Sequence, residues 1–295
     1  MKNTVFTGAA TAIITPFKNG QVDYEAFGKM IEFQIAGGID AIVAVGTTGE
    51  GPTLKDEEHK AVVKYCVDKV AGRVPVIAGT GSNDISYAIE LTKYCCDIGA
   101  DAMLLVTPYY NKATQNGLYK HFTAVADAST VPVILYNVPT RTSCNLLPKT
   151  VARLAEHPNI VAIKEAAGNM SQAVELFALC GDKIDIYSGE DALTVPMMAM
   201  GGSGAISVLS NVVPKGAVEM SDAALRGDFE TAAKLQCKFL PLINALFSEV
   251  NPIPAKAAVS AMGFGADILR LPLTPMEDAT RAKLYEEMRK LGIEV

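Results

Sequence analysis

The stretch Ile160-Val161-Ala162-Ile163-Lys164-Glu165 places four apolar residues directly before a lysine. A run this short and this rich in Ile and Val is typical of a strand that is buried on both faces, as in a parallel sheet. Lys164 would then lie at the carboxyl end of the strand, where α/β barrels carry their chemistry. Burial disfavours a charged amine, and a neutral amine forms a Schiff base with a carbonyl compound. Position alone favours a simpler alternative, a surface lysine that Glu165 neutralises.

The rest of the chain repeats this pattern. Eight short apolar runs, separated by helix-length segments, predict strands at residues 11–15, 41–45, 75–78, 102–106, 131–136, 160–164, 184–187 and 204–209. Amphipathic segments predict helices at 24–36, 54–70, 86–98 and 171–180, with a capping box at 53–56 opening the second. Strict alternation implies parallel strands and right-handed crossovers, and eight units favour a closed (β/α)₈ TIM barrel. A doubly wound open sheet is the alternative, but no G-x-G-x-x-G follows an early strand.

Helices alone are predicted after the last strand. They fall at residues 217–225, 229–247, 253–262 and 275–291, with turns at 226–228 and 251–254. We therefore predict a catalytic barrel domain over residues 1–225 and a C-terminal helical domain over residues 226–295.

Composition limits the class of protein. The 295 residues are 49% hydrophobic, which is enough for a large core, and the net charge of −6 disfavours nucleic acid or an anionic membrane as a partner. The six cysteines form no C-x-x-C pair and the three histidines lie far apart, so we expect reduced thiols, no metal site and a cytoplasmic protein. The N-terminus lacks the pattern of a signal peptide. Residues 192–214 carry no charge and are long enough to cross a membrane, but proline and glycine interrupt them in the middle. This pattern predicts a helix, a glycine turn and a buried strand rather than a membrane span.

Polar residues follow several predicted strands and would meet at one mouth of the barrel. Gly46-Thr47-Thr48-Gly49-Glu50 combines hydroxyls with exposed backbone N–H groups, which suits a small carboxylate, although an ordinary glycine turn has the same pattern. Arg141 offers a bidentate fork for a second carboxylate, or a surface ion pair. A tyrosine such as Tyr136 at this mouth either packs or moves protons between substrate and water.

Taken together, these segments resemble the dihydrodipicolinate synthase family, also called 4-hydroxy-tetrahydrodipicolinate synthase. Their order and spacing are similar to the family from end to end, the C-terminal part included. The segments that carry the resemblance are Gly46-Thr47-Thr48-Gly49-Glu50, Pro108-Tyr109-Tyr110-Asn111, Tyr136-Asn137-Val138-Pro139-Thr140-Arg141-Thr142, Ile163-Lys164-Glu165, Ser188-Gly189-Glu190-Asp191 and Gly204-Ala205-Ile206-Ser207-Val208.

The resemblance implies a lyase of diaminopimelate and lysine biosynthesis, with no metal or organic cofactor. Lys164 would form a Schiff base with pyruvate, and the resulting enamine would attack L-aspartate 4-semialdehyde. Tyr136 would be the main acid/base group. Thr47 would link it to Tyr110, which would reach in from the neighbouring subunit of a homotetramer, a dimer of dimers.

The resemblance also implies the groups that bind substrate. Thr48, with Thr47, would hold the pyruvate carboxylate, and Arg141 would hold the carboxylate of the semialdehyde. Gly189 and Ile206 would line the pyruvate pocket through their backbones. The two anion sites agree with the hydroxyl-rich loop and the arginine found from the residues alone.

Many family members bind lysine as a feedback inhibitor at the dimer interface. His59, Asn83 and Tyr109 match positions of that allosteric site. The positions that depart from the inhibited pattern are Gly51, Pro52, Asp56 and Tyr87. Because a glutamate usually stands at the last of these, its loss removes a partner for the ammonium group of lysine. We expect weak inhibition by lysine or none.

Two alternatives stay open from sequence. Another Schiff-base lyase of the superfamily, such as N-acetylneuraminate lyase or a keto-sugar-acid aldolase, would share Lys164, Tyr136 and the glycine-hydroxyl loop. Arg141 and Tyr110 favour the short, charged semialdehyde over a polyol chain. A non-catalytic keto-acid-binding regulator with the same fold is the second alternative, but it would be expected to have lost part of this set.

Overall fold

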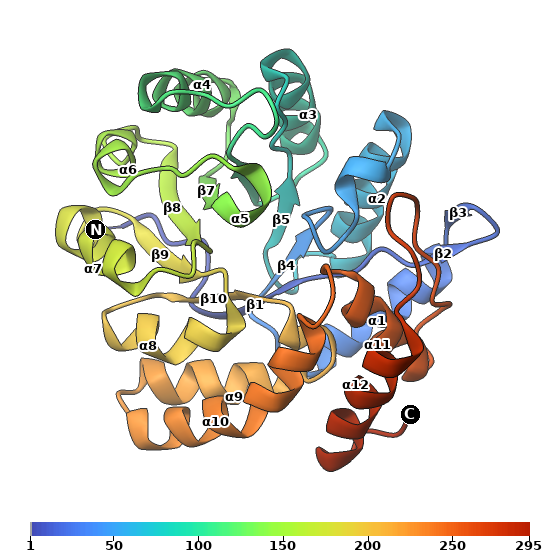
Figure 1. Ribbon diagram of the computed structural model, residues 1–295. Helices are drawn as coiled ribbons and strands as arrows, with labels where there is room; N and C mark the ends of the chain where they lie inside the picture. Colours follow the sequence, from blue (N-terminus) through green and yellow to red (C-terminus); the bar gives the residue numbers. More distant parts are fainter. Residues whose placement is uncertain (1) are drawn as a thin grey trace.

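In the computed structural model, which describes residues 2–295, eight parallel strands close into a barrel surrounded by helices (Figure 1). The strands are β1 (Gly8–Ala12), β4 (Ala41–Ala44), β5 (Val76–Gly79), β6 (Ala102–Val106), β7 (Val133–Asn137), β8 (Ile160–Glu165), β9 (Asp185–Ser188) and β10 (Gly204–Ser207). Spatial order follows chain order, and β1 closes the ring by pairing with β10 and β4. The predicted (β/α)₈ barrel is therefore confirmed, and the open sheet is excluded.

The barrel strands bury both faces, which is why their sequences are almost continuously apolar. Their residues are buried throughout, apart from a half-buried Val106. One face packs inside the barrel, where alanines such as Ala10 and Ala41 leave room for Tyr136 and Tyr187. The other face packs against the outer helices in a separate and larger apolar cluster. The interior is thus filled by side chains, as expected for an eight-stranded barrel.

Strand β1 lies earlier in the chain than the predicted range 11–15. It begins at Gly8, which pairs with Gly204 on β10. A Cβ atom on Gly204 would overlap the carbonyl oxygen of Gly8, so the two backbones approach as closely as they do only because glycine stands there. Hydrophobicity gives no sign of this contact. Ile13 and Ile14 made residues 11–15 look like the strand, but they are buried just beyond its end.

Helices cover the outside of the barrel (Figure 1). They are α1 (Tyr24–Ala36), α2 (Asp56–Val70), α3 (Ile85–Asp97), α4 (Gln115–Ala128), α6 (Pro148–Leu154), α7 (Met170–Cys180), α8 (Thr194–Ala199) and α9 (Pro214–Leu225). Short elements occupy the loops, namely the hairpin of β2 (Phe17–Lys18) and β3 (Gln21–Val22), the helix α5 (Pro139–Thr142) and the 3₁₀ turns η1 (Gly51–Thr53), η2 (Asp191–Leu193) and η3 (Leu209–Asn211). The predicted helices are found with small shifts of their ends.

The predicted capping box at residues 53–56 is wrong. Thr53 ends the turn η1, and its hydroxyl donates to the carbonyl oxygen of Glu50 at 3.0 Å. Helix α2 starts at Asp56 instead, and the Glu58 carboxylate accepts from the backbone N–H of Lys55 at 3.1 Å. The glutamate half of a capping box is therefore present at residues 55–58, two residues later than the sequence pattern indicated.

The C-terminal part consists of α10 (Phe229–Leu246), α11 (Ile253–Ala261) and α12 (Asp278–Lys290). Helix α10 lies alongside α9 (Figure 1), and α12 contacts both α10 and α11. A domain boundary after residue 225 stays a prediction, because these helices share apolar contacts with the barrel helices.

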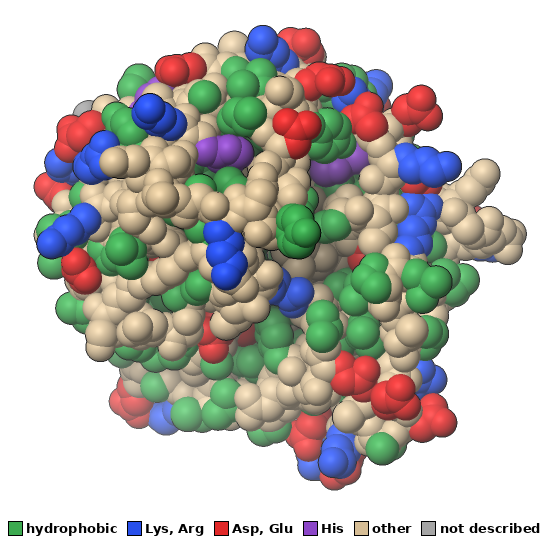
Figure 2. Space-filling view, turned by 45° about the horizontal axis from the view of Figure 1, so that its top comes forward, with side chains coloured by type: hydrophobic (Ala, Val, Ile, Leu, Met, Phe, Trp, Pro, Cys, Tyr) green, Lys and Arg blue, Asp and Glu red, His purple; other side chains and the backbone are tan. Residues whose placement is uncertain are grey.

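Charged side chains of both signs lie on the surface. Figure 2 shows acidic and basic side chains interspersed over one face, which is hollowed near its middle. No helix in the described part of the chain has the length and apolar character that crossing a bilayer requires. The uncharged segment 192–214 forms α8, a glycine turn and β10, as predicted.

Candidate active site

Lys164 and Tyr136 form the centre of the site. They lie on the adjacent strands β8 and β7 and are partners in the parallel register. The Nζ atom of Lys164 is 4.5 Å from the centroid of the Tyr136 ring, and each residue is only 6% exposed. Lys164 takes part in none of the ion pairs found among residues 2–295. A buried amine without a carboxylate partner is poised to act as a nucleophile.

Glu165 does not neutralise Lys164, because successive side chains of a strand point to opposite faces. Its carboxylate accepts hydrogen bonds from Asn137 Nδ2 at 3.1 Å, Gln172 Nε2 at 3.3 Å and the backbone N–H of Ala167 at 2.6 Å. Burial raises the pKa of the Glu165 carboxyl, while these hydrogen bonds oppose the rise. The alternative of a surface lysine paired with Glu165 is thereby excluded.

Gly189, which follows β9, makes room for the lysine. A Cβ atom at this position would lie 3.0 Å from both Cγ and Cε of Lys164 and 2.7 Å from Cβ of Ala166. Its backbone N–H donates to the carbonyl oxygen of Glu165 at 2.7 Å, which fixes the distance between the two strands. Any side chain here would displace the Lys164 stem.

The loop that follows β4 carries Thr47 and Thr48. It starts at Val45, whose φ of 58° is a strained value for a β-branched residue. A Cβ atom on Gly51 or on Gly79 would lie 2.6 Å from the Val45 carbonyl oxygen, so the loop folds tightly against glycines. This turn brings both threonines to the wall of the cavity above Lys164.

That cavity has a volume of about 400 Å³, and its wall includes Lys164, Tyr136, Thr47, Thr48, Arg141 and Gly189. A residue of the C-terminal part, Asn251, joins the two sides. Its side-chain Nδ2 donates to the Thr48 hydroxyl oxygen at 3.0 Å, and its backbone carbonyl oxygen accepts from Arg141 Nη2 at 3.0 Å. A hydroxyl pair and a guanidinium therefore flank one buried amine. This arrangement suits two substrates that each carry one carboxylate.

Glu50, the last residue of the glycine-hydroxyl motif, anchors this loop. Its carboxylate pairs with Lys256 of α11, and both side chains are almost completely buried. It also accepts from the backbone N–H of Arg270 at 3.1 Å. Burial lowers the pKa of Lys256, and the charge of Glu50 opposes that change. Glu50 thus ties the active-site loop to the C-terminal helices and is absent from the cavity wall.

A sequence model described as the Dihydrodipicolinate synthetase family matches residues 5–291. The chain belongs to this family. It is 55% identical to the 4-hydroxy-tetrahydrodipicolinate synthase of Geobacter sulfurreducens, with 97% of this chain and 99% of the relative covered. Two solved structures are also similar to this chain. The chloride-inhibited dihydrodipicolinate synthase of Acinetobacter baumannii in complex with pyruvate is 46% identical, with a TM-score of 0.96 and coverage of 98% and 100%. A monomeric dihydrodipicolinate synthase variant is 40% identical, with a TM-score of 0.96 and coverage of 98% of each chain.

Two residues that the dihydrodipicolinate synthetase resemblance singled out lie outside this cavity wall. Tyr110 is 92% exposed, has a φ of 68° and is absent from the wall of the cavity. Ile206 is buried inside the barrel on β10, and Val208 forms the wall after this strand. The roles assigned to Tyr110 and Ile206 stay predictions.

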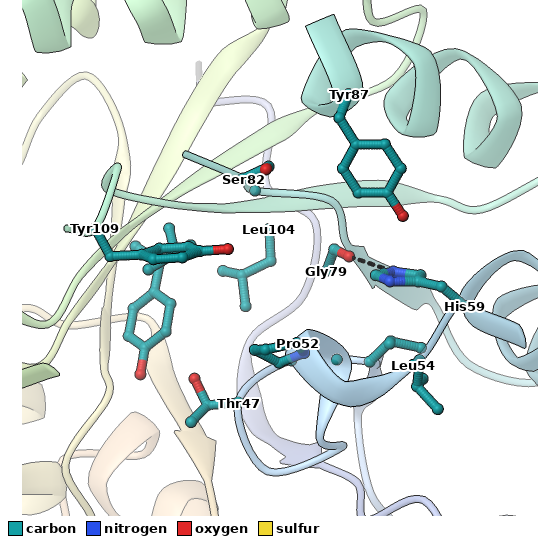
Figure 3. A pocket seen from close by; sticks show the side chains of 15 residues that line it. Thr47, Pro52, Leu54, His59, Gly79, Ser82, Tyr87, Leu104 and Tyr109 are labelled. Atoms are coloured by element: carbon teal, nitrogen blue, oxygen red, sulfur yellow. Dashed lines mark hydrogen bonds between the residues drawn. The ribbon is translucent and has the colours of Figure 1, made fainter. Parts of the chain in front are cut away.

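A second cavity of about 190 Å³ adjoins the first and shares Thr47 and Tyr136 with it (Figure 3). Its wall includes His59, Tyr87 and Tyr109. His59 Nε2 bonds the carbonyl oxygen of Gly79 at 2.9 Å, and the Tyr87 ring points toward this histidine in Figure 3. Burial lowers the pKa of His59 and raises the pKa of Tyr87 to about 12.

The residues matched to the allosteric site of the family therefore lie close together. Asn83 lies just outside the second cavity, and its Nδ2 donates to the Tyr109 carbonyl oxygen at 3.3 Å. Gly51 and Pro52 line the cavity. Asp56 is absent from the wall and interacts with Tyr87 and Lys60 behind it. The proposed lysine site stays a prediction.

Sequence reasoning missed two functional positions. The sequence around Asn251 indicates only a turn, and nothing local marks its contact with a threonine 203 positions away. Asp191 belongs to a segment that carries the family resemblance, but the sequence pattern assigns no role to it. Its fully buried carboxylate accepts from the backbone N–H groups of Val208 and Leu209 at 3.0 and 2.9 Å, which holds the cavity wall after β10. Burial raises the pKa of Asp191, and the hydrogen bonds that its carboxylate accepts oppose that rise.

Proposed function

We propose that the chain is a 4-hydroxy-tetrahydrodipicolinate synthase, which condenses pyruvate with L-aspartate 4-semialdehyde. The observation that carries this proposal is the buried, unpaired Lys164 against the Tyr136 ring, in a cavity with Thr48 on one side and Arg141 on the other. The names of the curated relatives support the reaction, and the pyruvate complex of the Acinetobacter baumannii relative supports the first substrate.

The first half of the reaction activates pyruvate. The unprotonated amine of Lys164 attacks the ketone carbon, and loss of water from the carbinolamine leaves a protonated imine. Loss of a methyl proton then gives the enamine. The Tyr136 hydroxyl is the group we assign to these proton transfers, because its ring packs against the Lys164 side chain. Thr47 and Thr48 hold the carboxylate, and no metal or organic cofactor is needed for these steps.

The second half joins the carbons and releases the product. The enamine carbon attacks the aldehyde carbon of the semialdehyde, whose oxygen takes up a proton. The amine of that substrate then displaces Lys164 by transimination, which closes the ring of 4-hydroxy-tetrahydrodipicolinate and frees the enzyme. Arg141 binds the semialdehyde carboxylate through its guanidinium, which the Asn251 carbonyl holds in place.

Pyruvate-dependent turnover of the semialdehyde tests the proposal. The product is coupled to a dihydrodipicolinate reductase, and consumption of NADPH is followed. We expect turnover in the wild type and its loss in Lys164→Ala. If the wild type shows no turnover but forms a borohydride-trapped pyruvate adduct, a sugar-acid lyase replaces the proposal. If it shows neither, a keto-acid-binding regulator replaces it.

The assembly we propose is a homotetramer, a dimer of dimers, in the cytoplasm. The exposure of Tyr110 supports an interface, because a 92% exposed tyrosine is free to complete the relay of a neighbour through Thr47. The six cysteines are all free, as expected in a reducing compartment. One solved relative is described as a monomeric variant, so assembly has to be measured for this chain. Light scattering coupled to size-exclusion chromatography would show a tetramer.

Regulation by lysine is proposed to be weak or absent. The wall of the second cavity contains no aspartate or glutamate among the described residues, whereas the ammonium groups of lysine need carboxylate or carbonyl partners. Tyr87 occupies the position where the inhibited pattern has a glutamate. Initial rates at increasing lysine concentration test this, and inhibition by submillimolar lysine would refute it.

A further inference from the structure

Asn251 contacts the active site twice, through two chemically different groups. The side-chain amide donates to Thr48 Oγ1, and the main-chain carbonyl accepts from Arg141. The residue is 5% exposed and forms part of the cavity wall. It comes from the segment between α10 and α11, so the C-terminal part of the chain supplies a contact that the barrel lacks.

The direction of the amide contact matters for the Thr48 hydroxyl. A hydroxyl has one proton to donate, and its oxygen accepts through lone pairs. A substrate carboxylate only accepts, so a threonine that serves it has to keep its proton free. The Nδ2 group of Asn251 occupies Thr48 Oγ1 as an acceptor, which leaves the hydroxyl proton available for a ligand in the cavity.

We propose that Asn251 is a positioning residue that serves the two carboxylate sites separately, its side chain orienting Thr48 toward pyruvate and its main-chain carbonyl holding Arg141 for the semialdehyde. This inference rests on the proposed function and adds a residue from the C-terminal part to it. The substrates are bound by Thr48 and Arg141, and Asn251 acts through them.

The segment that carries Asn251 has its own anchor. The buried pair of Glu50 and Lys256 links the loop that carries Thr48 to α11. The backbone N–H of Lys256 donates to the Pro252 carbonyl oxygen at 2.8 Å. These contacts do not involve the Asn251 side chain. Variants of that side chain are therefore expected to keep the fold, and the main-chain contact to Arg141 is expected to survive them.

Two substitutions separate a positioning role from a packing role. Asn251→Ala removes the amide and keeps the carbonyl. Asn251→Asp keeps the shape of the side chain but replaces the donor by an acceptor. The Thr48 hydroxyl would then donate its hydrogen bond to the aspartate instead of to a ligand. We expect the pyruvate concentration for half-maximal borohydride-trapped adduct to rise about tenfold in the alanine variant, and further in the aspartate variant. The KM for the semialdehyde should stay within about twofold in the alanine variant.

The controls distinguish the possible failures. Ser248→Ala removes a side-chain hydrogen bond from the same segment, to the Ala245 carbonyl oxygen, and should leave both constants unchanged. In a Thr48→Val background, Asn251→Ala should add no further change in pyruvate half-saturation. An aspartate variant that equals the wild type, or an alanine variant that weakens both substrates equally, would overturn the inference alone. A wild type that forms no pyruvate adduct would overturn the proposed function and this inference with it.

Discussion

Gly189→Ala tests whether the position of Lys164 limits the reaction. The added methyl group would lie 3.0 Å from Cγ and Cε of Lys164 and 2.7 Å from Cβ of Ala166. Carbon atoms in contact prefer about 3.5–4.0 Å, so the Lys164 stem has to move by about 0.5–1 Å. The flexible lysine can move away from its own overlap. Ala166 has no rotamer to change, so its overlap has to be relieved by a small shift of the backbone that carries Gly189 or Ala166.

The expected loss follows from this displacement. A misplacement of about 1 Å costs on the order of 100-fold in rate when the reacting atoms have to be aligned. Overpacking of the kind introduced here costs about 1–3 kcal/mol of stability, which leaves a protein of this size folded. We therefore expect Gly189→Ala to form the pyruvate adduct about 100-fold more slowly than the wild type, while urea unfolding shows only a moderate loss of stability.

The assay is a time course of borohydride trapping with pyruvate, read by intact-protein mass. Gly117→Ala is the matched control, because Gly117 lies on α4 and lines neither cavity. That variant should trap pyruvate at the wild-type rate. If the folded Gly189→Ala protein also traps pyruvate at the wild-type rate, the argument that Gly189 makes room for Lys164 is wrong.

Three further predictions concern binding, stability and pH. Arg141→Ala should raise the semialdehyde KM about 10- to 100-fold and leave pyruvate adduct formation unchanged; equal losses for both substrates would give Arg141 another role. Lys256→Met should lower the free energy of unfolding by about 3–5 kcal/mol because it leaves Glu50 buried and unpaired, and adding Glu50→Gln should recover part of this in urea titrations. Burial lowers the pKa of His59 below its ordinary 6.5, so the unfolded chain binds the proton more tightly and stability falls as pH drops below that value. His59→Gln should lose less stability than the wild type between pH 7 and pH 5, and an identical pH dependence would contradict this.

The site could be predicted from sequence to the extent that it depends on strand ends. Lys164, Tyr136 and the loop with Thr47 and Thr48 each follow an apolar run, and the carboxyl ends of parallel strands meet at one mouth. Their meeting therefore follows from the order of the runs once the barrel is assumed. Tyr110 shows the limit of this argument, because it also follows a strand, β6, yet is 92% exposed and absent from the cavity wall of its own chain.

The sequence by itself determined the fold class and the residues at the mouth, because short apolar runs recur eight times with helix-length segments between them. Tertiary structure alone decided the contacts between distant segments. Asn251 reaches Thr48 across 203 positions, and Lys256 reaches Glu50 across 206. The close approach of Gly8 and Gly204 likewise decides where β1 begins. Hydrophobic periodicity reports which side of an element is buried, but it carries no information on which polar side chain of another element will lie opposite.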